Sequence, residues 1–340
     1  MKLLKELTEI SGVSGNESNI RKLILKEIKK YVKNVKVDKY GNIIAHKKGK
    51  GAKVMLAAHM DEIGFMVKSI SSNGNINISA VGGIEALAYI GQKVNISVKG
   101  GISGVITLAG INDDEETEEV PEVADLMLLT GLTKKELQKK GVEIGTFIEP
   151  IQETYVLGKK GIICGKALDD RIGCYILLEL ARKLEKSKAH IYFVFTVQEE
   201  IGLYGSKTSV SSIDPDWAVA IDVTNADDSD EHTHNITKKI GKGPCVVIKD
   251  AEMISNLCLD KEIKKIAKKK KIKIQLDVSD FGTTDALSIS ISKGGIPTAI
   301  VGVAVKNLHT SYGISSLEDI NETVKILEVL MKNPPKTCID

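Results

Sequence analysis

The spacing of apolar residues indicates an α/β domain at the start of the chain. Apolar positions recur with helical spacing over residues 1–32, and a break at 11–15 predicts two helices joined by a loop. Shorter runs predict strands at 35–38, 43–45 and 54–58. The run at 54–58 is apolar throughout, which is typical of a strand buried on both faces of a sheet.

Between about residues 68 and 163 the pattern changes. Short strand-like runs at 76–78, 93–98 and 104–108 are separated by Gly-rich turns, which is typical of a small β-rich domain. One helix is expected at 133–140, where Thr133 and Glu136 have the spacing of a capping box. The acidic run at 113–119 is expected to be a solvated loop.

After Gly165 the alternation of helices and strands resumes. We expect strands at 191–197, 218–221, 272–276 and 298–301, and helices at 169–186, 253–270, from 284 and at 317–332. The sequence therefore predicts a catalytic α/β domain built from residues 1–66 and 165–340. A β-rich domain at 67–164 would be inserted into it.

Composition excludes several classes of function. A formal net charge of +2 is too small to indicate a nucleic-acid or membrane-surface partner, and no apolar run approaches the ~20 residues of a membrane span. The N-terminus predicts an amphipathic helix and not a signal peptide. Five cysteines, an odd number with no C-x-x-C pair, are expected to be reduced thiols of a cytoplasmic protein.

Candidate chemistry lies where strands end or helices begin. The carboxyl ends of strands in an open α/β sheet meet at one edge, so residues far apart in sequence can share a site there. The candidates are His59, Asp169, the pair Glu199 and Glu200, Asp222 and His309. A single His, Asp or Glu in such a position is more often a turn or capping residue, and only the whole pattern favours a site.

Carboxylates and imidazoles together suit zinc, cobalt or manganese. With one glutamate of the pair counted, five protein ligands exceed the three that hold a single catalytic zinc. A carboxylate shared by two metals ~3.5–4 Å apart would account for the surplus. Asp61 follows two residues after His59 and could orient its imidazole. Cys164 and Cys174 lie near these segments, but plain packing is favoured for both.

Seven segments, in this order and spacing, resemble the dinuclear metallo-aminopeptidases of the tetrahedral (TET) type, also called glutamyl or deblocking aminopeptidases. They are AHMDEIGF (58–65), LDDRIG (168–173), QEEIG (198–202), IDVT (221–224), GKGP (241–244), GTTDA (282–286) and LH (308–309). The resemblance implies a zinc-exopeptidase-like mixed sheet flanked by helices, with an inserted PDZ-like dimerisation domain. It also implies peptide substrates and a homo-oligomer, a hollow tetrahedral dodecamer.

The resemblance further implies a role for each site residue. Asp169 would bridge two divalent ions, zinc or cobalt, and would be joined to Asp170 by a cis peptide. A water bridging the metals would lose its proton to the general base. The remaining roles are His59 and Asp222 on one metal, Glu200 and His309 on the other, Glu199 as general base and Asp61 as the group that orients His59.

The sequence departs from the family pattern in places, and other functions remain open. Thr310 stands where the family more often has Ser, a Pro-Pro-His segment is absent, and His232 and His234 have no assigned role. A deacylase or carboxypeptidase could use the same metals, and a shell protein could bind them structurally. A glycosidase is disfavoured, because adjacent Glu199 and Glu200 cannot oppose each other across a sugar ring. Leu-like or other neutral N-terminal residues are the expected substrates.

Overall fold

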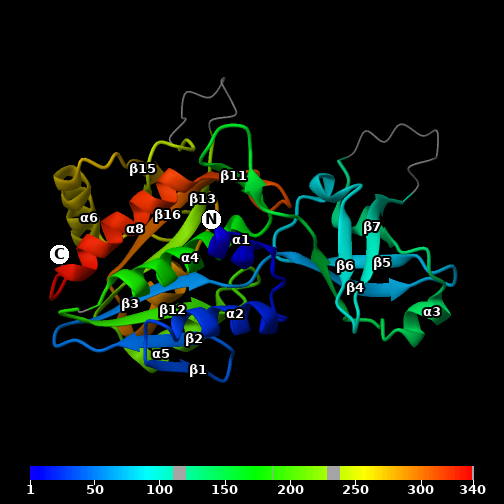
Figure 1. Ribbon diagram of the computed structural model, residues 1–340, viewed down its shortest axis with the longest axis horizontal. Coiled ribbons are helices and arrows are strands. Elements are labelled where there is room, and N and C mark those ends of the chain that lie inside the picture. Colours follow the sequence, from blue (N-terminus) through cyan, green and yellow to red (C-terminus); the bar gives the residue numbers. More distant parts are fainter. Residues whose placement is uncertain (110–119, 186, 228–237, 339–340) are drawn as a thin grey trace.

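The computed structural model describes residues 1–109, 120–185, 187–227 and 238–338 (Figure 1). The acidic run at 113–119 and the two histidines His232 and His234 lie outside these residues. No helix among the described residues is long and apolar enough to cross a membrane.

One mixed sheet of eleven strands forms the main domain. Its order is β1-β2-β12-β3-β13-β16-β17-β11-β10, with β14 paired to both β15 and β16. The four strands β12, β3, β13 and β16 run parallel to their neighbours within that group, so their carboxyl ends meet at one edge. The strands are β1 (Asn34–Val37), β2 (Ile43–Lys47), β3 (Lys53–His59), β10 (Tyr155–Val156), β11 (Ile162–Gly165), β12 (His190–Thr196), β13 (Trp217–Asn225), β14 (Cys245–Lys249), β15 (Gln275–Val278), β16 (Thr298–Lys306) and β17 (Gly313–Ser316).

Helices cover both faces of this sheet, which explains why β3 is apolar at successive positions. Val54 and Leu56 point into the core beneath α1 (Lys2–Glu9), α2 (Ser18–Ile28), α4 (Leu168–Lys183), α6 (Leu257–Lys270) and α8 (Leu317–Lys332). Met55 and Ala57 point to the opposite face, against α5 (Tyr204–Ile213) and α7 (Asp285–Ser290). Because successive strand residues face opposite sides, a strand between two helical layers has to be apolar throughout.

The inserted domain is a closed six-stranded barrel beside the main domain (Figure 1). Its strands are antiparallel, follow the order β4-β5-β8-β7-β6-β9, and enclose a separate core in which Phe65 meets Tyr89 edge-on at 5.0 Å. The capping box of Thr133 and Glu136 is present at α3 (Lys134–Lys139). The expected mixed sheet with an inserted β-rich domain is confirmed. The barrel strands are β4 (Gly64–Ile70), β5 (Ile76–Val81), β6 (Lys93–Ile96), β7 (Ile102–Leu108), β8 (Leu126–Leu129) and β9 (Phe147–Pro150), and short 3₁₀ turns lie at Ala86–Tyr89, Val123–Asp125 and, in the main domain, Ser292–Gly294.

The barrel occupies Gly64–Pro150, while β10 and β11 already pair with each other and with the main sheet. The division at residues 67–164 therefore stays a prediction. Helix α6 begins at Leu257 and not at residue 253, because the side chain of Asn256 caps it by accepting from the Leu259 N–H at 3.1 Å.

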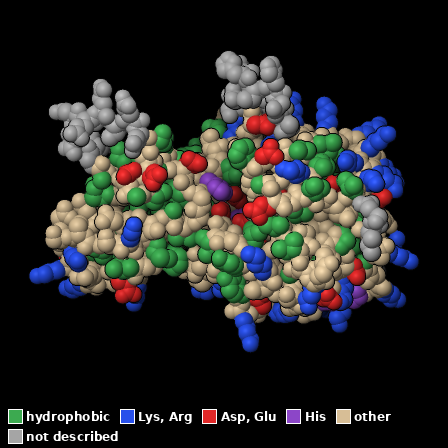
Figure 2. Space-filling model, turned by 180° about the vertical axis from the view of Figure 1, so that it is seen from behind, with side chains coloured by type: hydrophobic (Ala, Val, Ile, Leu, Met, Phe, Trp, Pro, Cys, Tyr) green, Lys and Arg blue, Asp and Glu red, His purple; other side chains and the backbone are tan. Residues whose placement is uncertain are grey.

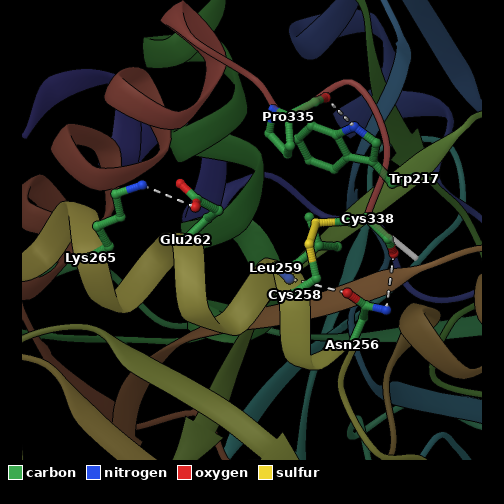
Figure 3. Close-up of a disulfide and its surroundings, with 8 residues drawn as sticks. All are labelled: Trp217, Asn256, Cys258, Leu259, Glu262, Lys265, Pro335 and Cys338. Carbon is green, nitrogen blue, oxygen red and sulfur yellow. Dashed lines mark hydrogen bonds and ion pairs between the residues drawn. A yellow bond between two sulfur atoms is a disulfide. The ribbon is translucent and has the colours of Figure 1, made fainter. Parts of the chain in front are cut away.

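The expectation that all cysteines are reduced thiols is wrong for two of them. Cys258 at the start of α6 forms a disulfide with Cys338, across a sequence separation of 80 residues (Figure 3). The chain after α8 folds back over α6, where the indole N–H of Trp217 donates to the Pro335 carbonyl at 3.1 Å. This return of the tail brings the two Cα atoms to 5.4 Å, well within disulfide range.

A buried ion-pair cluster joins the two points where the chain crosses between domains. Glu62 lies where the chain leaves for the barrel, and Lys166 lies where it has returned; their charged atoms are 2.6 Å apart. The other carboxylate oxygen of Glu62 accepts from Arg171 at 3.3 Å and from the Gly12 N–H at 2.9 Å. The buried carboxylate of Glu62 thus has a cation at each of its oxygens, which offsets the cost of removing it from water.

Candidate active site

Two groups of three metal-binding side chains meet at the carboxyl edge of the sheet and share one member. His59, Asp169 and Asp222 form the first group, and Asp169, Glu200 and His309 form the second. The Nε2 atom of His59 lies 2.9 Å from Asp169 Oδ1 and 3.9 Å from Asp222 Oδ1. On the other side, His309 Nε2 lies 3.3 Å from Asp169 Oδ2 and 3.7 Å from Glu200 Oε2.

The fold places each of these side chains by a local device. His59 is the last residue of β3, and Asp222 lies near the carboxyl end of the parallel neighbour β13. Asp169 lies in the first turn of α4 and is joined to Asp170 by the expected cis peptide bond. His309 lies in the turn after β16, with a left-handed φ of 58°. All five ligand candidates therefore come to one site, as the strand-end pattern predicts.

Glu199 and Glu200 follow β12 in a loop that Asp61 holds. The Asp61 carboxylate accepts the backbone N–H of Glu199 at 3.1 Å, that of Glu200 at 3.3 Å and the hydroxyl of Ser14 at 2.5 Å. Its oxygen Oδ1 is 3.6 Å from Nδ1 of His59, whereas the Asp61 carbonyl is 3.2 Å from the same nitrogen. Asp61 therefore contacts the imidazole mainly through its backbone, and its carboxylate fixes the two glutamates.

The site concentrates negative charge in a buried place. Burial, together with the charge of Asp169, raises the pKa of Glu200 and of Asp222 to about 8, and burial raises the pKa of Glu199 well above its usual range. Burial opposes the charged form of His309, but its hydrogen bond to Asp169 raises its pKa to about 9. Carboxylates crowded in this way favour bound cations, and the oxygen and imidazole donors of the two groups fit divalent metal ions.

A cavity of about 1480 Å³ opens over these residues. Figure 2 shows it as a hollow where red carboxylates and purple histidines gather between the main domain and the barrel. Beyond the metal groups its walls come from β13, β14, the loop at 279–284 and Glu85 of the barrel. At about 1480 Å³ the cavity exceeds the ~300–1,000 Å³ of most small-molecule sites and is large enough for a peptide end.

The structure also shows a buried acid near the site, Asp285, that the sequence reasoning missed. Asp285 was treated only as a helix start, yet it is buried and accepts from the Thr196 hydroxyl at 2.5 Å, beneath the Glu199 loop. In the sequence, only its position in the family-like segment GTTDA (282–286) pointed to a role for Asp285. Cys174 is not directed at the metal groups, since its thiol donates to the backbone carbonyl of His59 at 3.1 Å.

Comparison with known proteins agrees with this geometry. A family model described as M42 glutamyl aminopeptidase matches residues 41–326, and a model described as AMPT matches residues 1–23. A lysyl aminopeptidase of Pyrococcus furiosus is 33% identical over 337 residues, covering 97% of this chain and 96% of the relative.

Solved structures match over the same length. A TET aminopeptidase from the marine sediment archaeon Thaumarchaeota archaeon SCGC AB-539-E09 has 31% identity and a TM-score of 0.94, covering 98% of this chain and 96% of the other. The TET1 peptidase of Pyrococcus horikoshii, which can assemble into a tetrahedron or a large octahedral shell, has 32% identity and a TM-score of 0.88, covering 98% and 99%. The resemblance found in the sequence is thereby confirmed. Matched along nearly its whole length, the chain belongs to the M42 glutamyl aminopeptidase family and is a metal-dependent aminopeptidase.

Proposed function

We propose that this aminopeptidase removes N-terminal residues from short peptides at a dinuclear metal site. The observation that carries the proposal is the pair of three-residue groups that share Asp169. His59 and Asp222 would hold one ion, Glu200 and His309 the other, and Asp169 would bridge them. When bound, the ions supply Lewis-acid polarisation of the peptide carbonyl and lower the pKa of water.

Glu199 is the group best placed to move protons. It belongs to neither ligand group, yet its carboxylate oxygen lies 4.0 Å from Nε2 of His59, within the same buried site. As general base, Glu199 takes the proton of the attacking water and then passes it to the leaving amine. Asp61 acts as a positioning residue, because its carboxylate accepts the backbone N–H groups of both Glu199 and Glu200 and so fixes the backbone on either side of the Glu199 Cα.

Hydrolysis of aminoacyl-p-nitroanilides, with and without chelator and beside N-acetylated controls, tests the proposal. We expect chelator-sensitive, metal-restored cleavage of the free-amine substrates alone. Cleavage of the N-acetylated substrates would indicate the deacylase function instead. No cleavage of any free-amine substrate by protein shown to carry both metals would leave the structural-shell function. The same set of substrates tests the preference for Leu-like or other neutral N-terminal residues that is expected from the sequence.

Three further expectations belong to the proposal. Zinc or cobalt is the expected ion, and metal analysis of the purified protein distinguishes them. A tetrahedral dodecamer, twelve chains of 36.8 kDa or about 440 kDa, is expected by light scattering. A cytoplasmic location is also proposed. The Cys258–Cys338 disulfide removes the argument from reduced thiols, although intracellular proteins of hyperthermophiles are often rich in disulfides. Fractionation of source cells tests the location.

A further inference from the structure

One wall of the cavity carries polar atoms that the fold leaves without partners. Asp250 directly follows β14, and Thr283 lies in the loop before α7; both line the cavity with Asp222. The backbone N–H of Ala251 donates to the carbonyl of Gly282 at 3.1 Å. This bond holds the two loops side by side, so that Asp250 and Thr283 belong to one wall.

Asp250 is a buried carboxylate with one oxygen satisfied and one not. Asp250 is only 4% exposed. Its oxygen Oδ1 accepts from the backbone N–H groups of Glu252 at 2.8 Å and of Met253 at 2.7 Å. Oxygen Oδ2 is buried and has no hydrogen-bond partner within the described part of the chain, and the same holds for Oγ1 of Thr283. Burying a carboxylate oxygen without a donor is costly, so this wall is suited to a ligand that brings N–H donors.

Two oppositely charged pairs are already formed near this wall. Lys238 and Asp277 are both buried in the cavity wall and their charged atoms lie 3.1 Å apart, while Asp280 lies 2.8 Å from Lys249. An acidic ligand would have to break the Lys238–Asp277 pair to gain a cation there. A basic ligand can supply a donor to the buried, unpartnered oxygen of Asp250 without disturbing either pair.

An apolar floor connects this wall with the metal groups. Val247 and Ile300 line the cavity and are paired across β14 and β16, and Ile300 is paired in turn with Ala220, two residues before Asp222. The aliphatic stem of a long side chain can pack along such a floor while its charged head reaches a polar end. Lys and Arg have this construction, and their heads carry only donors.

We propose that the wall of Asp250 and Thr283 selects peptides whose N-terminal residue is Lys or Arg. The proposal rests on the aminopeptidase function above and replaces the neutral preference expected from the sequence. Asp250 binds the ammonium or guanidinium group, and the hydroxyl oxygen of Thr283 accepts a second hydrogen bond from it. Peptides with an acidic first residue are the poorest substrates.

The test compares kcat/KM for Lys-, Arg-, Leu- and Glu-p-nitroanilides with metal-loaded enzyme and with two isosteric variants. Wild type should prefer Lys and Arg over Leu by about tenfold or more. Asp250→Asn keeps Oδ1 for the turn but removes the charge, and should lower the Lys/Leu ratio by at least ~10-fold. Asp280→Asn removes an exposed charge from the same cavity, and should change that ratio by less than about twofold.

Thermal unfolding of both variants verifies that they fold like wild type. A wild-type preference for Leu or Glu, or an equal loss of Lys and Leu cleavage in Asp250→Asn, overturns the selection proposal while the aminopeptidase function stands. Absence of cleavage of all four substrates by protein carrying both metals overturns the function itself, and the selection proposal with it.

Discussion

Removing the disulfide between Cys258 and Cys338 should cost the protein several kcal/mol of stability. The link closes a loop of 80 residues, and loop-closure entropy for that length gives about 4.5 kcal/mol at 25 °C. With an unfolding entropy of about 2.1 cal/mol/K per residue over 340 residues, this corresponds to a fall in Tm of about 6 °C. Replacing both cysteines by Ala makes the change without leaving a lone thiol.

The assay is calorimetric unfolding of wild type and variant at equal protein concentration and saturating metal, because bound metal and assembly also shift Tm. Reductant should move wild type toward the double variant and leave the variant unchanged. Fluorescence of Trp217, the single Trp, should change as well, since its indole N–H is bonded to Pro335 in the tail. A matched control is Cys245→Ala, which removes a buried thiol outside any cross-link and should cost about 1 kcal/mol.

Two results would refute this reasoning. Thiol titration of the denatured, unreduced protein should find three free groups, so a count of five would mean that the link does not form. A loss below about 1 kcal/mol in the double variant would mean that the unfolded chain gains little freedom when the loop is opened.

Further predictions concern the metal site and one helix. Glu199→Gln should lower kcat at least ~100-fold with two metals still bound, as metal analysis and kinetics on the same sample would show; near-full activity would remove Glu199 as the base. Asp61→Asn should lower kcat/KM roughly 10- to 100-fold, because the two backbone N–H groups lose a charged acceptor, and an unchanged value would count against its positioning role. Because the pKa values of Glu200 and Asp222 are about 8 in the metal-free site, both are mostly protonated at pH 7. Metal binding must then release protons and become tighter as pH rises to 8. The released protons are taken up by the buffer, so the calorimetric enthalpy of metal binding should differ between two buffers, and an identical enthalpy would contradict this. Thr133→Ala removes the cap of α3 and should cost about 1 kcal/mol, seen as roughly fivefold faster hydrogen exchange in that helix; unchanged exchange would mean that the cap is not stabilising.

The metal groups were predictable because a local rule places them. Each candidate follows an apolar strand or opens a helix, and parallel strands bring such ends together wherever they stand in the sequence. His59 and Asp222 are 163 positions apart by number, yet β3 and β13 are neighbours in the sheet.

Other features depend on pairings that no local pattern encodes. The partner of Cys258 could not be read from an odd number of cysteines, since it depends on the tail returning over α6. Strand β14 is a different case: it has a local signal, the apolar run CVVI (245–248) after the turn residues GKGP, and was overlooked in spite of it. Asp250 carries no sequence signal that separates it from an ordinary turn acid, and only its buried, unpartnered oxygen sets it apart.

The Glu62–Lys166–Arg171 cluster allows much of the barrel to change without changing the geometry of the metal site. It fastens together the outgoing and the returning chain only a few residues from His59 and Asp169. The spacing of the ligands is therefore insulated from changes in the parts of the barrel that lie away from the cavity. Loops there can lengthen while the metal groups keep their geometry, whereas Gly83 and Glu85 of the barrel line the cavity and are tied to the site.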